Sequence, residues 1–177
     1  MNTMDCITSR RSIRKFEDRP VPHEVIEQMV AAAAYAPSWK NTQITRYIAI
    51  ESREIIDKIA DEYAPFNAPI LHGAPLLFAV TMITGRSGFE RDGSYSTDRE
   101  DGWQMFDCGI ASQTLCLAGH ELGIGTVILG IFDRLGLQKY LEIPEGQELV
   151  ALIPAGYPAI DPTAPRRKTV EDLLTYR

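Results

Sequence analysis

Hydrophobic residues recur at helical spacing in two long stretches of the chain. In residues 24–36 they fall three and four positions apart, which predicts an amphipathic helix. Pro22 suits its entry, and Pro37 ends it because proline cannot continue the hydrogen-bond ladder. Residues 103–122 are apolar nearly all round and are followed by Gly123, a common stop for a helix. A helix that is apolar on every side must be buried, either in a core or at a subunit interface.

Shorter apolar runs predict the remaining elements. Buried strands are expected at residues 75–83, 125–132 and 148–155, and a shorter strand at 47–50. Further helices are expected at residues 1–16, where a short helix leads into a basic turn, at 52–62, at 133–140, and after Thr169 with Asp172 in a capping box. Helices and strands do not alternate regularly, so their order favours an α+β fold over a doubly wound parallel sheet. We expect one domain spanning residues 1–177.

The composition narrows the classes of partner. Lys and Arg number 18 against 24 Asp and Glu, a formal net charge of -6, which disfavours nucleic-acid and membrane-surface binding because phosphate-rich partners repel an acidic chain. The three cysteines, Cys6, Cys108 and Cys116, form neither a disulfide framework nor a metal-binding spacing. The N-terminal stretch lacks the apolar core of a signal peptide, and no apolar run is long enough to cross a bilayer. We therefore expect a cytoplasmic protein without a metal site.

Familiar catalytic motifs do not fit this chain. The run GIGTVILG at residues 123–130 follows a predicted helix and opens a strand, the reverse of a dinucleotide-binding loop. No Walker motif and no GxSxG elbow occurs, and the histidines follow no hydrolase pattern. His120 is therefore interpreted as a structural residue rather than a catalytic base.

Two basic clusters stand out against the acidic background. The first contains Arg10, Arg11, Ser12 and Arg14, and the second Arg166, Arg167 and Lys168. On a helix end, Arg10 and Arg14 would share one face, so their guanidinium groups could converge. Guanidinium groups bind phosphate in bidentate fashion and stay charged in partly dry sites. The two clusters suit one phosphate group if the fold brings them together; the alternative is that both are solvated surface.

Polar loops supply further candidates. Asn41 and Gln43, in the loop PSWKNTQIT at residues 37–45, carry amide donors and acceptors that suit the edge of a heteroaromatic ring, and Trp39 could stack on it or close a pocket. The loop could equally be a simple turn. Residues 84–102 are rich in Gly, Ser and charge and predict a long irregular loop, of a kind often used as a lid.

Taken together, these segments resemble the FMN-dependent nitroreductase family over nearly the whole chain and in the family's order. The N-terminal flavin-binding motif is similar to RRSIRKF, and the second motif, usually APSxxNxQPW, is similar to PSWKNTQ after an Ala-rich helix. The central helix and the strand beside the flavin are similar to DCGIASQTLCLAGHELGIGTVILGIFD, and the closing segment to AGYPA followed by PRRKTVEDLL. Four motifs in register make the match specific.

The resemblance implies a nitroreductase-like fold, with a central, mostly antiparallel sheet flanked by helices, in an intertwined homodimer with two shared FMN sites. The phosphate, ribityl chain and pyrimidine side of FMN would be held by Arg10, Arg11, Ser12 and Arg14. The phosphate site would be completed by Arg167 with Arg166 or Lys168. The second subunit would supply Ser38, Trp39, Asn41 and Gln43. Backbone groups lining the flavin would come from Ile128, Leu129 and Gly130.

The implied activity is reduction of small electron-poor acceptors, such as nitroaromatics or quinones, with electrons from NADH or NADPH in a ping-pong cycle. The flavin carries the chemistry, so no side chain is assigned as catalytic. Alternatives are a relative that uses O2 to dehydrogenate a substrate or to destroy flavin, a flavin-binding protein without turnover, and a protein without any cofactor. Two departures from the family pattern matter. Ile44 replaces the usual Pro, which leaves the course of the loop after Gln43 undetermined, and residues 84–102 match no family segment, which leaves the identity of the acceptor undetermined.

Overall fold

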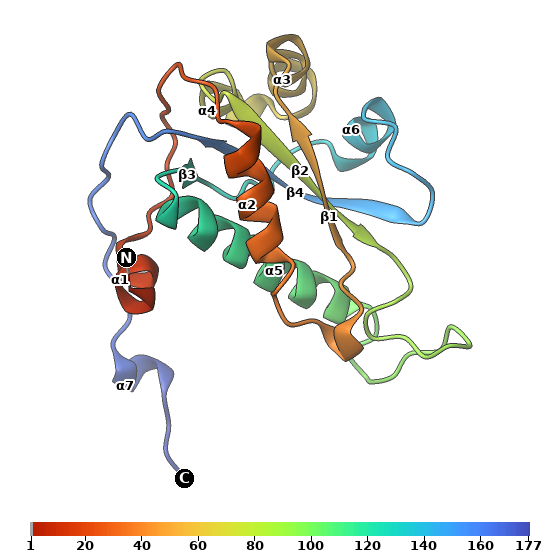
Figure 1. Ribbon diagram of the computed structural model, residues 1–177. Helices are drawn as coiled ribbons and strands as arrows, with labels where there is room; N and C mark the ends of the chain where they lie inside the picture. Colours follow the sequence, from red (N-terminus) through yellow and green to blue (C-terminus); the bar gives the residue numbers. More distant parts are fainter. Residues whose placement is uncertain (1) are drawn as a thin grey trace.

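The computed structural model describes residues 2–177, which form an antiparallel sheet with strand order β1-β2-β4-β3 (Figure 1). The strands are β1 (Thr45–Ile50), β2 (Leu76–Ile83), β3 (Gly125–Thr126) and β4 (Gln147–Gly156). Both the α+β class and the antiparallel sheet predicted from the sequence are confirmed. β1 is an edge strand, with one side paired to β2 and the other side unpaired within the described chain.

Helices cover the sheet and connect its strands. They are α1 (Thr3–Ser9), α2 (His23–Ala33), α3 (Arg53–Lys58), α4 (Ala68–Leu71), α5 (Gly102–Glu121), α6 (Arg134–Tyr140) and α7 (Val170–Leu173). Short 3₁₀ turns lie at Trp39–Asn41 and Pro65–Asn67, and a π-helical turn at Ile59–Tyr63 continues α3. Within residues 2–177, no helix combines the length and the apolar character needed to span a bilayer.

Successive residues of β2 point into two different cores. Phe78 and its alternate neighbours pack against α2 and α5, whereas Leu77 and Ala79 pack against α3, α4 and α6. This alternation follows from the two-residue period of a strand. Because helices cover both faces, neither face needs polar residues, which explains the continuous apolar run seen in the sequence.

Most of the helix ends were predicted correctly from residues close to them in the sequence. The Ser52 side chain accepts a hydrogen bond from the Ile55 N–H at the start of α3, and Thr169 and Asp172 form the expected capping box of α7. Gly123 ends α5 with a φ of +80°, a conformation that glycine adopts without steric cost. α2 ends at Ala33 rather than at residue 36, because the N–H groups that follow bond in tighter turns before Pro37.

The strand predicted at residues 125–132 is only partly correct. β3 contains only Gly125 and Thr126, and pairing with β4 resumes in the same register at Leu129, which exchanges both backbone hydrogen bonds with Leu152 at 2.8 and 3.0 Å. Between these points Val127 donates to the carbonyl of Pro154, and proline has no N–H with which to return the bond. The missing donor interrupts the ladder of hydrogen bonds between Thr126 and Leu129.

Candidate functional site

The first basic cluster lies on extended backbone, not on a helix end as predicted. α1 stops at Ser9, and Arg10 has φ -56° and ψ 133°. Ser12 pairs with Thr126 in a parallel bridge, and the Ile13 N–H donates to the Thr126 carbonyl at 3.0 Å. The buried side chain of Ile13 fixes this segment against β3, so the sheet rather than a helix positions the arginines.

The two ends of the chain nevertheless meet in one cavity of about 390 Å³. Its walls are formed by Arg10, Arg11, Ser12 and Arg14 from the N-terminal segment and by Pro162, Thr163, Pro165 and Arg167 from the C-terminal segment. Arg166 and Lys168, the neighbours of Arg167, do not line it. Four arginines therefore line one space, and no carboxylate is among the lining residues.

The charge in this cavity is not neutralised by the protein. Among the ion pairs formed within residues 2–177, none involves any of these four arginines. The Nε of Arg10 is buried and has no hydrogen-bond partner within the described chain. A buried donor without a partner costs free energy, so this atom indicates a place where an anionic ligand would be stabilised.

His120 lies beside the arginine segment, where its Nε2 is 2.8 Å from the Ser9 hydroxyl. Burial and the positive charge of Arg10 lower the pKa of His120, with a smaller contribution from Arg11. The lowered pKa favours the neutral ring, which forms a hydrogen bond with the Ser9 hydroxyl.

The 38–43 loop has an unusual backbone. Lys40, Asn41 and Gln43 all have positive φ, at 45°, 55° and 47°. Non-glycine residues rarely adopt this region, and such strain concentrates at functional sites. The loop is held by its own bonds, since the Gln43 N–H donates to the Ser38 hydroxyl at 3.0 Å and the Gln43 amide donates to the Asn41 carbonyl oxygen at 3.1 Å. The second bond leaves the Nδ2 donors of Asn41 and the side-chain Oε1 of Gln43 unpaired among the described residues.

The 38–43 loop and the arginine cavity lie at opposite ends of α5 (Figure 1). The backbone of Trp39 bonds to Asp107 near the start of α5, whereas Ser9 contacts His120 near its end. At a rise of roughly 1.5 Å per residue, these contacts are about 20 Å apart along the helix. None of the predicted loop residues lines the arginine cavity of its own chain.

The segment after β3 brings Ile128 and Gly130 to the surface on either side of Leu129. Because both backbone groups of Leu129 are bonded to Leu152, a ring bound there would meet Ile128 and Gly130 rather than the Leu129 backbone. Asn67, which adjoins this segment, was not predicted from the sequence. Asn67 is buried and donates to the Ile131 carbonyl at 2.8 Å, and its neighbour Phe66 is exposed. An Asn within the proline-bounded stretch APFNAP was the available signal.

Residues 84–102 form a loop with several internal bonds. Phe89 and Tyr95 form an antiparallel bridge with ring centroids 4.9 Å apart. Hydrogen bonds from the Ser96 hydroxyl and then from Lys40 lower the pKa of Glu90. Gly88 has φ +83°, and a Cβ on it would lie 2.6 Å from the Glu100 carbonyl oxygen, so this turn requires glycine.

Ile44 has a defined structural role. Its side chain is 1% exposed and packs with Met82 and Cys108, and its carbonyl accepts the Ile83 N–H at 2.9 Å. The 38–43 loop therefore enters β1 through a buried anchor that already pairs with β2.

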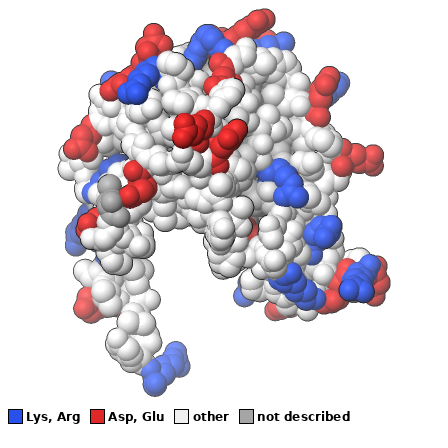
Figure 2. Space-filling model, viewed as in Figure 1, with Lys and Arg blue, Asp and Glu red and all other residues white. Residues whose placement is uncertain are grey.

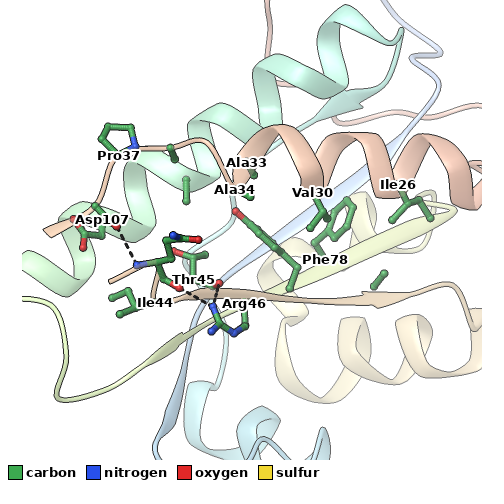
Figure 3. Close-up of a pocket in the computed structure, with 16 residues that line it drawn as sticks. Ile26, Val30, Ala33, Ala34, Pro37, Ile44, Thr45, Arg46, Phe78 and Asp107 are labelled. Carbon is green, nitrogen blue, oxygen red and sulfur yellow. Dashed lines mark hydrogen bonds between the residues drawn. The ribbon is translucent and has the colours of Figure 1, made fainter. Parts of the chain in front are cut away.

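A second cavity, of about 360 Å³, lies between α2 and the edge strand β1 (Figure 3). Figure 3 shows Ile26, Val30 and Ala33 of α2 on one side and Thr45 and Arg46 of β1 on the other. The hydroxyl of Tyr47, another lining residue, is buried without a partner in the described chain, and burial raises the pKa of its phenol.

The C-terminal tail leaves the body of the molecule and exposes apolar side chains. Leu173 and Tyr176 are 76% and 88% exposed, and Val170 and Leu174 are also exposed. Figure 2 shows the tail projecting from the body and a largely uncharged surface between them. Within the single described chain α5 is only partly covered, with Met105 and Phe106 exposed, so its predicted burial would have to be completed at a subunit interface.

No cluster of three or more His, Cys, Asp and Glu side chains suited to a metal ion occurs in residues 2–177. Cys6, Cys108 and Cys116 are buried free thiols, and burial raises the pKa of Cys108 and Cys116.

Comparison with known proteins gives one consistent result. The family model described as "Nitroreductase family" matches residues 7–64 and 61–157. A Methanothermobacter thermautotrophicus protein with the provisional name NADH dehydrogenase/NAD(P)H nitroreductase is 34% identical over 92% of this chain and 80% of its own length. The FMN reductase [NAD(P)H] of Bacillus subtilis is 27% identical over 97% of this chain and 71% of its own. A provisionally assigned nitroreductase from Desulfovibrio desulfuricans, solved in complex with FMN, superposes with a TM-score of 0.80 at 29% identity, covering 100% of this chain and 98% of that one.

Proposed function

The chain belongs to the nitroreductase family, and from this premise we propose that it is a homodimeric FMN-dependent oxidoreductase that reduces small electron-poor acceptors with NAD(P)H. The observation that carries the proposal is the convergence of Arg10 and Arg167 on one cavity that no carboxylate lines. The names of the relatives, an FMN reductase and NAD(P)H nitroreductases, support the same cofactor and electron donor.

The arginine cavity fits the phosphate of FMN. Arginine forks bind phosphate oxygens in bidentate, charge-assisted hydrogen bonds, and the buried Arg10 Nε lacks a partner that such an oxygen would supply. Arg11, Arg14 and Arg167 add positive charge, and the Ser12 hydroxyl adds a donor. We assign phosphate binding to these residues and leave Arg166 and Lys168 outside the site.

The site requires a second copy of the chain. Within one chain the 38–43 loop does not line the arginine cavity, and its contact with α5 lies about 20 Å along the helix from that of the arginine segment. In a two-fold dimer, the loop of one copy faces the cavity of the other. Ser38 and Trp39 would then contact the flavin from the second copy. Asn41 would offer its free Nδ2 donors to the ring edge, and Gln43 its free side-chain oxygen.

The C-terminal tail fits the same dimer. Its exposed Val170, Leu173, Leu174 and Tyr176 need an apolar partner surface, because burying such side chains stabilises association. The cavity between α2 and the unpaired edge of β1 offers one, together with the unpartnered Tyr47 hydroxyl. We propose that the tail of each copy packs there on the other, which also covers an open strand edge.

FMN, when bound, supplies the redox chemistry by accepting a hydride from NAD(P)H and passing reducing equivalents to the acceptor in a ping-pong cycle. The chain holds the phosphate, orients the ring edge through the amides of Asn41 and Gln43, and brings Ile128 and Gly130 to the surface beside it. Arg14 adds positive charge that favours the more negative, reduced form of the cofactor. No side chain needs to act as an acid or base.

Anaerobic titration of the purified protein with NADH and with NADPH tests the proposal. Reconstituted protein should bind about one FMN per chain, as each of the two equivalent sites takes one. The visible absorption band of the bound flavin should bleach with at least one of the two nicotinamide nucleotides. A nitroaromatic or a quinone should then restore the band without oxygen. Bound FMN that neither nucleotide bleaches would reject the enzyme in favour of a non-catalytic binder, and restoration by O2 alone would favour an oxygen-using relative.

The acceptor panel should include an iodophenol. A relative from Haliscomenobacter hydrossis, 29% identical over 85% of this chain and 76% of its own length, is named iodotyrosine deiodinase. If the iodophenol reoxidises the reduced flavin and iodide is released, the acceptors would be halogenated phenols rather than nitro compounds or quinones.

A further inference from the structure

A buried carboxylate on α5 connects two surface segments. Asp107 is 3% exposed, and its carboxylate accepts the backbone N–H of Trp39 at 3.0 and 3.2 Å from its two oxygens. The same carboxylate accepts the hydroxyl of Ser87 at 2.6 Å, and Ser87 is itself fully buried. One side chain thus joins the 38–43 loop to the beginning of the 84–102 segment.

Two further links connect the same pair of segments, one through Trp103 of α5 and one directly. The ring centroids of Trp39 and Trp103 are 4.8 Å apart, and Trp103 donates through Nε1 to the Thr97 hydroxyl at 2.9 Å. The ammonium of Lys40 lies 2.9 and 3.1 Å from the two carboxylate oxygens of Glu90. The exposed ion pair contributes little by itself, whereas the Asp107 bonds are buried and charge-assisted.

The backbone of the 38–43 loop depends on this support. Its three positive φ values lie away from the ordinary minima, and such conformations persist only where the surroundings determine them. The bond from the Trp39 N–H to Asp107 holds the loop to the rigid helix α5 just before Lys40, the first of the three strained residues. Loss of this bond would let the loop relax.

We propose that Asp107 is a positioning residue that holds the 38–43 loop and the 84–102 segment as one unit, and that this unit covers the flavin held by the other copy. The inference rests on the proposed function, in which the 38–43 loop serves the second copy's flavin. It follows that the acceptor lies beneath the 84–102 segment of the copy whose arginines do not bind that flavin. Trp39 of this unit continues into a series of rings with Trp103 and the exposed Phe106 of α5, which suits a planar aromatic acceptor.

Hydrogen exchange measured by mass spectrometry on the full-length protein tests the connection itself, with or without FMN. Asp107→Asn and Ser87→Ala each remove or weaken a bond at the junction, and Ser94→Ala is the matched control because its hydroxyl donates only to Asp92 at the tip of the same segment. We expect exchange in residues 38–43 and 86–97 to rise together, on the order of tenfold, in the first two variants. In Ser94→Ala it should rise only near residues 92–96.

A rise confined to one of the two segments would overturn the coupling. If hydrogen exchange rose equally throughout β2 and α5, Asp107 would be merely structural, and this result would also overturn the coupling. Should Asp107→Asn fail to fold, Ser87→Ala decides alone, because it leaves the bond between Asp107 and Trp39 in place.

Mixed dimers test which flavin the unit covers. When one copy carries Arg10→Ala and the other Asp107→Asn, our arrangement places both lesions in one site and leaves the other intact, so about half of the wild-type acceptor reduction should remain. When both lesions are on one copy and its partner is wild type, neither site is intact, and the KM for the acceptor should rise roughly tenfold or more at the occupied site. The opposite pattern would place the unit over its own copy's flavin and overturn the inference. Wild-type dimers without FMN binding or turnover would instead refute the proposed function and leave the exchange result to decide the role of Asp107.

Discussion

Arg10 and Arg167 come from opposite ends of the chain and line the same cavity. The approach is set by non-local pairing: Ile13 N–H bonds Thr126, and the Ala159 N–H bonds the Lys15 carbonyl, so both termini are attached to the same end of the sheet. A phosphate between the two arginines would accept charge-assisted bonds from both. The approach of Arg10 and Arg167 therefore allows a direct test of the proposed phosphate site.

Replacing Arg10 or Arg167 with Ala should weaken FMN binding by about 1.5–3 kcal/mol, or roughly tenfold to a hundredfold, because each change removes a charge-assisted hydrogen bond. Quenching of FMN fluorescence during titration measures the dissociation constant. Arg166→Ala is the matched control, since it changes the same charge next to Arg167 but does not line the cavity. Equal losses in Arg166→Ala and Arg167→Ala would indicate general electrostatics instead of a defined site.

Gly125→Ala should displace the arginine segment. A Cβ at this position would lie 2.5 Å from Cγ1 and 2.7 Å from Cβ of Ile13, and the buried Ile13 has little room to move. Overpacking of this kind costs about 1–3 kcal/mol of folding stability, and the shift should also weaken FMN binding. Urea denaturation and FMN titration measure the two effects. Gly73→Ala, where the added carbon meets only the Ile70 carbonyl oxygen at an ordinary 3.8 Å, should change neither.

Truncation after Thr169 should weaken the dimer while leaving Arg167 in place. The change removes Val170, Leu173, Leu174 and Tyr176, the apolar groups assigned to the partner's surface. Sedimentation velocity across a concentration series should show dissociation at concentrations where the full chain is dimeric, and FMN should be lost in parallel because the 38–43 loop comes from the second copy. Leu135→Ser, which changes an equally exposed leucine on α6, should leave the assembly intact. A truncated chain that stays dimeric with unchanged affinity would exclude the proposed role of the tail.

Stability should depend on pH through His72. A hydrogen bond to Asp57 raises the His72 pKa above 6.5, with a further contribution from Asp61, and the bond to His72 lowers the Asp57 pKa below 3.8. The raised pKa of His72 adds stability that is complete below 6.5 and is lost as pH rises through the folded value. The lowered pKa of Asp57 adds stability that is present above 3.8 and is lost as pH falls through its folded value.

His72→Gln should therefore remove the part of the pH dependence that comes from His72. The melting temperature of the variant should change less than that of the wild type between about pH 6 and 8. The side chains are 43% and 39% exposed, so the pair should contribute only about 0.5 kcal/mol after screening by solvent. Thermal melts of the variant and the wild type in matched buffers measure the difference. An identical pH profile in both proteins would show that the pair adds nothing to stability.

Much of the local structure was predictable because it depends on neighbouring residues. The spacing of Ile26, Met29 and Ala33 specifies the buried face of α2, and the Ser52 and Thr169 caps mark helix starts within one turn of themselves. The continuous apolar run of β2 required helices on both faces of the sheet. The break after Thr126 was not predictable, because it depends on Pro154, a residue of a different strand.

By itself, the sequence determined the helices, the strands and the residue types that can bind a phosphorylated ring, since short-range periodicity and side-chain chemistry specify these. Only the tertiary structure decided that the arginines extend along β3, that Arg167 rather than Arg166 or Lys168 reaches their cavity, and that the 38–43 loop lies at the other end of α5. It also revealed Asp107 as a junction, because a carboxylate on an apolar helix shows its partners only once distant backbone groups pack against it. Such contacts join segments far apart along the chain, and no local pattern encodes them.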